Sequence, residues 1–192
     1  ELSEQEVYER LPTSVSKDRY TRALTIFVTR CRGERMSSGD LRARIQRHRP
    51  QDDEERDFLA LAEVIYDAYF EAVRAAEFDD FKGVMWRAVS KVENGDTEFK
   101  SPQEKGDLMA VRHILIDEFQ DFSKPFHALI EAIQTVNPEV RVFAVGDDWQ
   151  AINGFAGSDL QFFNGFNQFF ENATRYQMTT NYRSARAIVK AS

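Results

Sequence analysis

The sequence predicts an α/β fold in which a helical segment precedes part of a parallel sheet. Two short apolar runs, at 114–116 and 140–145, each end abruptly in acidic residues, and a helical pattern lies between them. The first half of the chain instead carries spaced apolar residues with few strand formers. Strand, helix and strand in this order are typical of a parallel β–α–β unit.

The first apolar run leads directly into an acidic loop. Ile114-Leu115-Ile116 is followed by Asp117-Glu118-Phe119-Gln120-Asp121. A continuous apolar run predicts a strand buried inside a parallel sheet, and open α/β sheets bind their ligands at the carboxyl ends of their strands. One carboxylate at such a position can hold Mg²⁺, and the next can orient a water for attack on a phosphate.

A second strand and loop follow at a suitable distance. Residues 125–136 have the apolar spacing of a helix, and Val140–Val145 then runs into Gly146–Gln150. In a parallel unit both loops, 117–121 and 146–150, open on the same edge of the sheet. Asp147 and Asp148 suit either a tight turn or a second polar layer around a metal ion, and we favour the turn.

Four segments resemble motifs of the UvrD/Rep-type superfamily 1 DNA helicases. Asp117–Asp121 resembles motif II, Val145–Ile152 resembles motif III, and Thr180–Ser184 is similar to motif IV. Phe78–Phe81 resembles the aspartate-rich helix start that precedes motif II in that family. Within the family, the run Phe143–Ile152 resembles the helicase IV branch. Four motifs in family order make the resemblance specific.

The resemblance implies a fold and a division of the chain. It implies a partial RecA-like (P-loop NTPase) parallel sheet with an inserted helical subdomain. Residues 1–75 would form a helical accessory subdomain of the 1B type, and residues 76–192 would form part of motor domain 1A with motifs II to IV.

The apolar spacing predicts helices over 2–11, 18–31, 40–48 and 54–76, with Ser or Asp available as N-caps. The longest has an apolar stripe formed by Ala60, Leu61, Val64, Ile65, Ala68 and Tyr69. Residues 92–107 are the most loop-like stretch of the chain.

The resemblance also implies roles for residues that would bind ATP. Asp117 would hold the Mg²⁺ that bridges the β- and γ-phosphates, and Glu118 would be the general base for the attacking water. Gln150 would hydrogen-bond the γ-phosphate or that water. Arg183 would stabilise charge on the γ-phosphate, and Tyr182 would stack on adenine. Taken singly, each residue also has a structural explanation in a turn, a cap or a core.

Motif III carries the residues expected to contact DNA. Phe155 matches the aromatic that stacks on a single-stranded base in the family, and Asn153 lies beside it. Asn153 and Ala156 depart from the family pattern, which has an aromatic and an arginine there. An alternative is therefore a non-unwinding factor that binds nucleic acid or a polymerase. A nuclease-fused recombination subunit is a third possibility.

The chain contains no Gly-x-x-x-x-Gly-Lys-Ser/Thr phosphate loop. We therefore expect an incomplete piece of a helicase whose Walker A segment and second motor domain lie elsewhere, and which does not hydrolyse ATP alone. The intact protein is expected to use ATP and Mg²⁺, to act on single-stranded and forked DNA, and to move 3′ to 5′, a direction that the resemblance alone implies.

Composition limits the other possibilities. The single cysteine, Cys31, excludes an internal disulfide, and the three histidines show no ligand spacing. No apolar run approaches membrane-spanning length, so we expect a cytoplasmic protein without membrane contacts. The net charge is −7, yet residues 17–49 (the basic segment) hold ten Lys or Arg against three Asp or Glu. Residues 52–80 (the acidic segment) hold two against eleven. The two segments either present a DNA-binding face or pair with each other.

Overall fold

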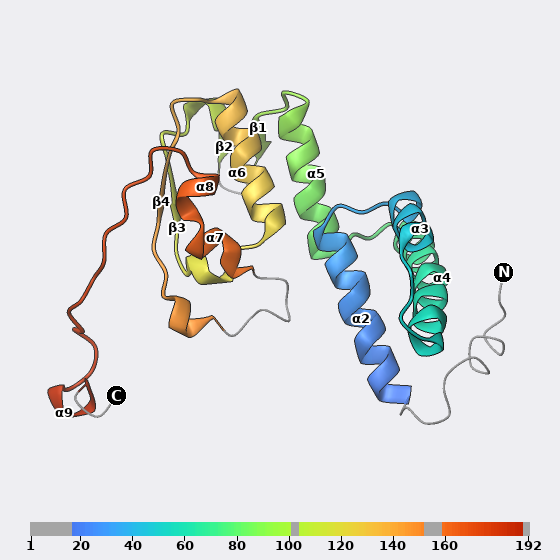
Figure 1. The fold of residues 1–192 in the computed structure, drawn as a ribbon. Helices are drawn as coiled ribbons and strands as arrows, with labels where there is room; N and C mark the ends of the chain where they lie inside the picture. The colour runs from blue at the N-terminus through green and yellow to red at the C-terminus, as the bar shows by residue number, and fades with distance from the viewer. Residues whose placement is uncertain (1–16, 101–103, 152–158, 190–192) are drawn as a thin grey trace.

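The computed structural model describes residues 17–100, 104–151 and 159–189 (Figure 1). Its first half is helical, as predicted, and the helix predicted over 2–11 lies outside the described residues. The helices of this half are α2 (Lys17–Gly33), α3 (Ser38–Arg47), α4 (Asp53–Ala75) and α5 (Phe81–Glu93).

Short polar side chains fix where these helices begin. Ser37 caps α3 in a capping box with Asp40, and the Asp52 side chain accepts a hydrogen bond from the backbone N–H of Glu55 at the start of α4. Asp80 caps α5 by accepting from the backbone N–H of Gly83. The prediction that the aspartate-rich segment starts a helix is thereby confirmed.

Helices α2, α3 and α4 share an apolar core. Tyr66 and Ala62 of α4 are fully buried, and the Tyr66 hydroxyl donates to the Met36 carbonyl at 2.6 Å. The predicted stripe on this helix was partly wrong, because Ala60 and Ala68 are exposed. The buried face is rotated toward Tyr66, whose long side chain reaches a polar partner across the core.

A parallel pair of strands forms the second half of the fold. Strand β3 (His113–Ile116) pairs with β4 (Arg141–Ala144), with Ile116 opposite Ala144, and α6 (Lys124–Val136) connects them. Helix α6 packs against α5, and their shared core contains Trp86, Val89, Val92, Ala132, Ile133 and Val140. The predicted β–α–β unit is confirmed.

The strands are covered on one face only within the described residues. Alternate residues of β3 and β4 are exposed, and the exposed fractions of Leu115 and Phe143 are 74% and 61%. The expectation of a buried strand was therefore wrong for Leu115. The pleat sends successive side chains to opposite faces, and the described elements pack only against the face that carries Ile114 and Val142.

The loop-like stretch 92–107 contains a small hairpin that the sequence did not indicate. Strands β1 (Glu98–Lys100) and β2 (Lys105–Asp107) pair antiparallel, and Phe99 lies opposite Gly106. The Phe99 ring occupies the space where a side chain at Gly106 would lie. Three-residue strands are too short to give a readable alternation of apolar and polar residues.

Phenylalanines fill the core beneath the loop that follows β3. Phe119 and Phe122 pack against α7 (Leu160–Asn164) and α8 (Phe166–Phe169), with ring centroids of Phe119 and Phe122 4.5 Å apart. After α8 the chain extends away from the body, and the last described element is the short helix α9 (Arg186–Val189) (Figure 1).

Candidate functional site

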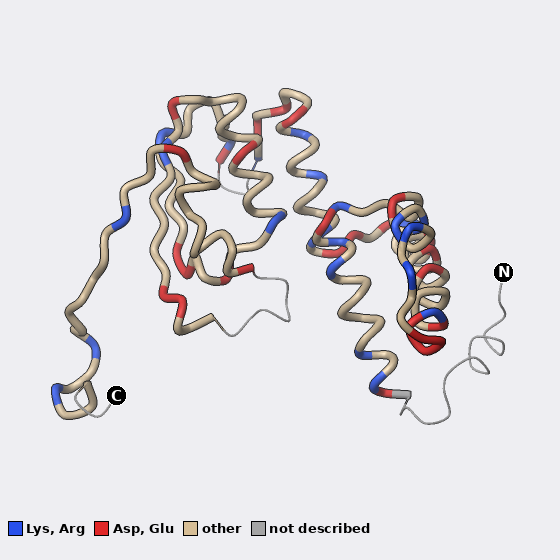
Figure 2. Tube along the Cα trace, viewed as in Figure 1, with Lys and Arg blue, Asp and Glu red and all other residues tan. Residues whose placement is uncertain are grey.

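The loops after β3 and β4 lie side by side. The Val145 N–H donates to the Ile116 carbonyl at 2.9 Å, and the Phe119 N–H donates to the Val145 carbonyl at 2.8 Å, so the parallel pairing continues past both strands. Figure 2 shows acidic residues at the ends of both strands. The prediction that the two polar loops open on one edge is confirmed.

A left-handed residue shapes the first loop. Glu118 has φ 51° and ψ 47°, and its N–H donates to Asp117 Oδ1 at 2.9 Å. This conformation turns the chain so that Asp117 and Glu118 are exposed while Phe119 and Gln120 are buried. A non-glycine residue in this region is energetically costly, and such residues cluster at functional sites.

The second loop is organised by Asp147. Its Oδ1 accepts the backbone N–H of Trp149 at 3.1 Å, which caps the 3₁₀ turn η3 (Asp148–Gln150). Its Oδ2 accepts Nε2 of Gln150 at 2.8 Å. The preferred prediction of a turn is confirmed for Asp147, and the same carboxylate holds the side chain of a predicted site residue.

Gln120 joins the two loops, a role that its sequence motif alone did not indicate. Its Nε2 donates to Glu118 Oε2 at 2.6 Å, and its Oε1 accepts the backbone N–H of Asp147 at 3.0 Å. A Cβ atom on Gly146 would lie 2.7 Å from that Oε1. The sequence feature that could have pointed to this role is a polar amide beside Phe119 in a turn, because a buried amide needs hydrogen-bond partners.

Asp117 is a suitable ligand for magnesium in combination with a phosphate. No group of three or more His, Cys, Asp or Glu residues that could hold a metal occurs among the described residues. Mg²⁺ in phosphate-binding sites usually takes one or two carboxylates together with substrate oxygens and water. An exposed carboxylate at a strand end fits that use, and the site does not form an all-protein cage.

The motif IV residues do not join the two loops in this structure. Tyr182 is 88% exposed, and Asn181 Oδ1 accepts the backbone N–H groups of Arg183 and Ser184 at 2.9 Å. These residues lie on the segment between α8 and α9 that extends away from the body (Figure 1). The predicted DNA-contacting residues Asn153 and Phe155 lie outside the described residues.

Ion pairs connect the basic segment with the acidic segment. Arg42 contacts Glu63 at 2.7 Å and Asp67 at 3.0 Å, and His48 lies 2.9 Å from Glu55. Figure 2 shows the two signs of charge next to each other on α3 and α4. The alternative in which the segments pair is therefore confirmed for these residues.

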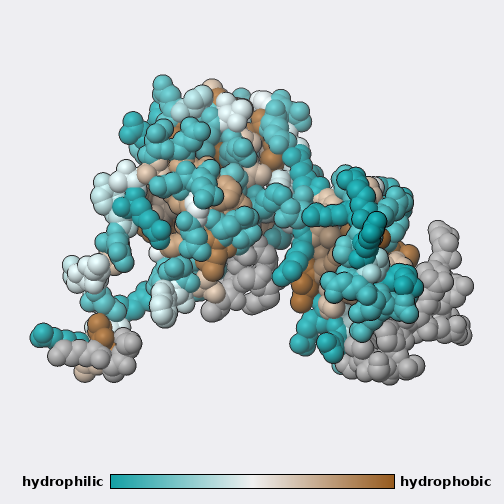
Figure 3. All heavy atoms as spheres, in the orientation of Figure 1, coloured by the Kyte–Doolittle hydropathy of each residue, from teal (hydrophilic) through white to brown (hydrophobic). Residues whose placement is uncertain are grey.

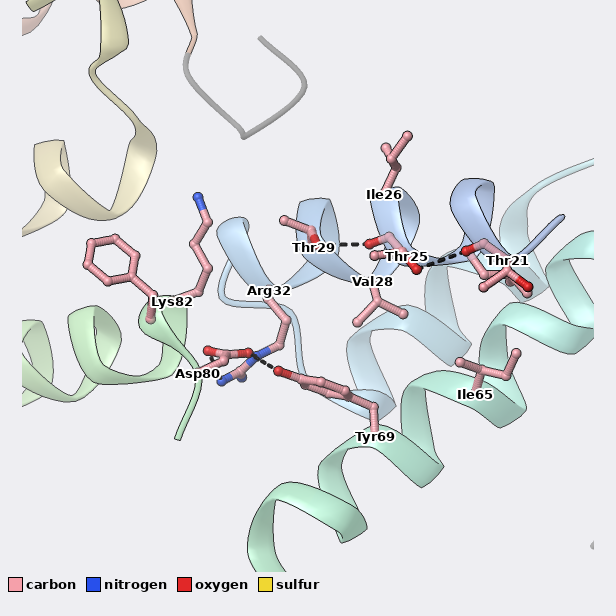
Figure 4. A pocket seen from close by; sticks show the side chains of 12 residues that line it. Thr21, Thr25, Ile26, Val28, Thr29, Arg32, Ile65, Tyr69, Asp80 and Lys82 are labelled. Atoms are coloured by element: carbon pink, nitrogen blue, oxygen red, sulfur yellow. Dashed lines mark hydrogen bonds and ion pairs between the residues drawn. The ribbon is translucent and has the colours of Figure 1, made fainter. Parts of the chain in front are cut away.

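A cavity of about 820 Å³ lies between α2, α4 and the start of α5. Its lining includes Ile26, Val28 and Lys82, together with a polar network of Arg32, Tyr69 and Asp80 (Figure 4). Burial lowers the pKa of Lys82. Apolar side chains are visible over α2 in Figure 3.

The polar network has strong internal contacts. Burial, together with a hydrogen bond to Asp80, raises the pKa of Tyr69 to about 12. For Asp80, burial acts to raise the pKa, but hydrogen bonds from Arg32, Tyr69 and the Gly83 N–H outweigh it and hold the pKa below its usual range.

None of the described helices is both long enough and apolar enough to cross a membrane.

Paired polar loops at the carboxyl ends of parallel strands are typical of α/β proteins, in which that edge of the sheet is the usual place for a ligand site. The chain belongs to the UvrD/Rep helicase family, because residues 3–171 match the model of the UvrD/REP helicase N-terminal domain. The predicted family is thereby confirmed.

Similar proteins include DNA helicase IV of Escherichia coli, which is 38% identical over 58% of this chain and 15% of its own length. DNA helicase II of E. coli is 30% identical over 67% of this chain and 17% of its own length. The ATP-dependent DNA helicase srs2 of Schizosaccharomyces pombe is 36% identical over 42% of this chain and 9% of its own length. The chain thus spans less than a fifth of these relatives.

Proposed function

We propose that this chain is part of the motor of an ATP-dependent DNA helicase and carries the residues that respond to the γ-phosphate. One observation carries the proposal: Glu118 and Gln150 follow adjacent parallel strands and are joined by hydrogen bonds through Gln120 and Asp147. Relatives named as DNA helicases support it.

The fold is proposed to be part of a RecA-like sheet with an inserted subdomain. Residues 1–75 would form the helical 1B-type subdomain and residues 76–192 part of motor domain 1A. The separate apolar clusters support this division, since one set joins α2 to α4 and the other joins α5 to α8.

Asp117 and Glu118 are proposed to act on ATP and water. Asp117 would hold Mg²⁺, which when bound would neutralise charge on the phosphates. Glu118 would accept a proton from the attacking water, because its carboxylate is exposed and Gln120 occupies only one of its oxygens. A carboxylate has lone pairs enough for both partners.

Three further residues are proposed to complete the nucleotide site. Gln150 would hydrogen-bond the γ-phosphate or the attacking water, and Arg183 would stabilise the charge that develops there. Tyr182 would stack on adenine. The exposure of Tyr182 and the extended segment that carries Arg183 leave both able to reach a nucleotide bound by further parts of the protein.

The intact protein is proposed to translocate 3′ to 5′ on single-stranded DNA and to unwind forked DNA. Phe155 would stack on a base, and Asn153 would lie at the same contact. A phosphate loop and a second motor domain would come from the rest of the protein, since relatives are several times longer and no phosphate-loop sequence occurs here. The chain alone would then not hydrolyse ATP.

A second candidate is a factor that binds DNA or a polymerase without unwinding. Asn153 and Ala156 favour it, because they replace a stacking surface and a cation expected at the junction of nucleotide and DNA. In that case the carboxylates would be dispensable.

The test is the ATPase rate of the intact protein with and without single-stranded oligothymidylate. Glu118→Gln should lower the DNA-stimulated rate by about 10²-fold or more, since general base catalysis contributes that much. Glu139→Gln, on the exposed turn before β4, is the matched control and should leave the rate unchanged. DNA binding without hydrolysis in the wild type would support the binding factor and overturn the motor.

A further inference from the structure

The amide of Gln120 is the centre of a hydrogen-bonded chain between the two loops. Three hydrogen bonds form this network: Gln150 Nε2 donates to Asp147 Oδ2, the Asp147 N–H donates to Gln120 Oε1, and Gln120 Nε2 donates to Glu118 Oε2. The three distances are 2.8, 3.0 and 2.6 Å. Every link therefore has hydrogen-bonding geometry.

We propose that Gln120 is a positioning residue that ties the Glu118 carboxylate to the Gln150 loop, so that a movement of this loop reorients the general base. The inference rests on the proposed function, which assigns hydrolysis to Glu118 and phosphate contact to Gln150.

Burial makes this link specific. Gln120 is 3% exposed, so solvent has little access to its amide. A neutral amide is the side chain that donates at one end and accepts at the other over this span. Glutamate at this position would keep the acceptor for Asp147 but would place a second carboxylate against Glu118.

The opposite loop leaves room for the amide. At Gly146 a Cβ atom would lie 2.7 Å from Gln120 Oε1 and 2.9 Å from the Phe119 nitrogen. The Phe119 nitrogen cannot move freely, because Phe119 is held in the phenylalanine core and its N–H pairs with Val145. Gly146→Ala therefore disturbs the same link from the other strand.

The two loops join different parts of the chain. The first loop leads into α6, while Gln150 immediately precedes the motif III segment with the proposed DNA contacts. If the second loop orients Glu118 through this link, the rate of ATP hydrolysis would depend on whether DNA is bound at the motif III segment. Loss of the link should then lower the DNA-stimulated rate while nucleotide binding persists.

The experiment compares Gln120→Met in the intact protein with Gln134→Met, a matched change at a half-buried position on α6. Methionine keeps the length of the side chain without its hydrogen bonds. We expect kcat for DNA-stimulated hydrolysis to fall by about 10²-fold, the effect of a small misplacement of a catalytic group, with KM for ATP little changed. Gly146→Ala should lower kcat in the same way, and Gln134→Met should not.

Two outcomes would overturn the inference. If Gln120→Met keeps the wild-type kcat while Glu118→Gln is inactive, Gln120 does not position Glu118, and the proposed function still stands. Absence of hydrolysis in the wild type would overturn both. Thermal unfolding of each variant separates the link from folding, because a purely structural role would lower the unfolding temperature, kcat and bound nucleotide together.

Discussion

Arg32 on α2 and Asp80 at the start of α5 form a two-point ion pair that joins the core of α2, α3 and α4 to α5, the helix that packs on α6. The Arg32 Nε and Nη2 atoms donate to Asp80 at 2.9 and 3.1 Å. The Arg32 carbonyl also accepts the Trp86 indole N–H at 2.8 Å, so the same residue contacts α5 twice. Since α5 packs on α6, which follows the Glu118 loop, this pair positions α2, and the core that it shares with α3 and α4, against the proposed motor.

Loss of this pair should destabilise the junction. Arg32→Ala would leave Asp80 partly buried without its cation, and we expect a loss of about 2–3 kcal/mol, below the 3–5 kcal/mol of a fully buried pair. Arg32→Lys should recover little, because an ammonium group cannot donate in a two-point fork. The measurement is urea unfolding followed by the fluorescence of Trp86, with exposed Trp149 replaced by Phe.

The pH dependence of protein stability provides a control for the role of this ion pair. The pKa of Asp80 is lowered in the fold, so the stability from its ionised form is complete above about pH 4 and is lost as the pH falls through the folded pKa. Arg32→Ala should flatten this acid-side slope. An unchanged slope would show that Arg32 does not set the pKa of Asp80.

A histidine inside the phenylalanine core should make stability depend on pH. His127 stacks on Phe162 with centroids 5.0 Å apart, and burial lowers its pKa against the opposing effects of Glu131 and a backbone hydrogen bond at Phe169. No protonation penalty exists above about pH 6.5, and the penalty grows as the pH falls toward the folded pKa.

Unfolding measured between pH 7.5 and about 5 checks this prediction. His127→Phe should remove the loss of stability on acidification, whereas the same change at exposed His48 should not. Equal pH profiles for the wild type and His127→Phe would contradict the assignment.

The exposed face of β3 and β4 should drive association of the isolated chain. Leu115 and Phe143 lie side by side in the register and are mostly exposed, and burying side chains of this size is worth about 1.5–3 kcal/mol each. We expect light scattering to show self-association that Leu115→Lys with Phe143→Lys reduces. A monodisperse wild-type chain at high concentration would contradict this prediction.

The sequence predicted the elements that local patterns determine. The ranges of α2, α3, α4 and α6 followed from apolar spacing and from the available cap residues. The helix start at Asp80 followed from the resemblance of Phe78–Phe81 to a family motif. The adjacency of the two loops followed from the parallel unit alone.

The features that the sequence predicted wrongly or did not predict depend on tertiary contacts. The Gln120 link needs the register of β3 against β4, and the buried face of α4 depends on which side meets Met36. The hairpin of β1 and β2 depends on the contact between the Phe99 ring and Gly106. Motif order does not determine where Arg183 lies, because described residues 181–189 are mostly exposed and no core contact fixes their position.

Phe119 should support both the core and the proposed catalytic turn. It is 2% exposed, and its ring lies 5.2 Å from Phe166 on α8. Phe119→Ala should destabilise the chain by about 3–5 kcal/mol, as other buried Phe truncations do. Phe81→Ala, at an exposed ring, is the control and should cost far less.

Phe119→Leu separates the two effects of this residue. Leucine keeps the core largely filled and leaves the backbone N–H free to pair with Val145, so most of the stability should return. If the turn is held mainly by that backbone bond and by the Gln120 link, DNA-stimulated hydrolysis in the intact protein should return with it. Stability that recovers while hydrolysis stays low would instead show that the ring itself orients Glu118.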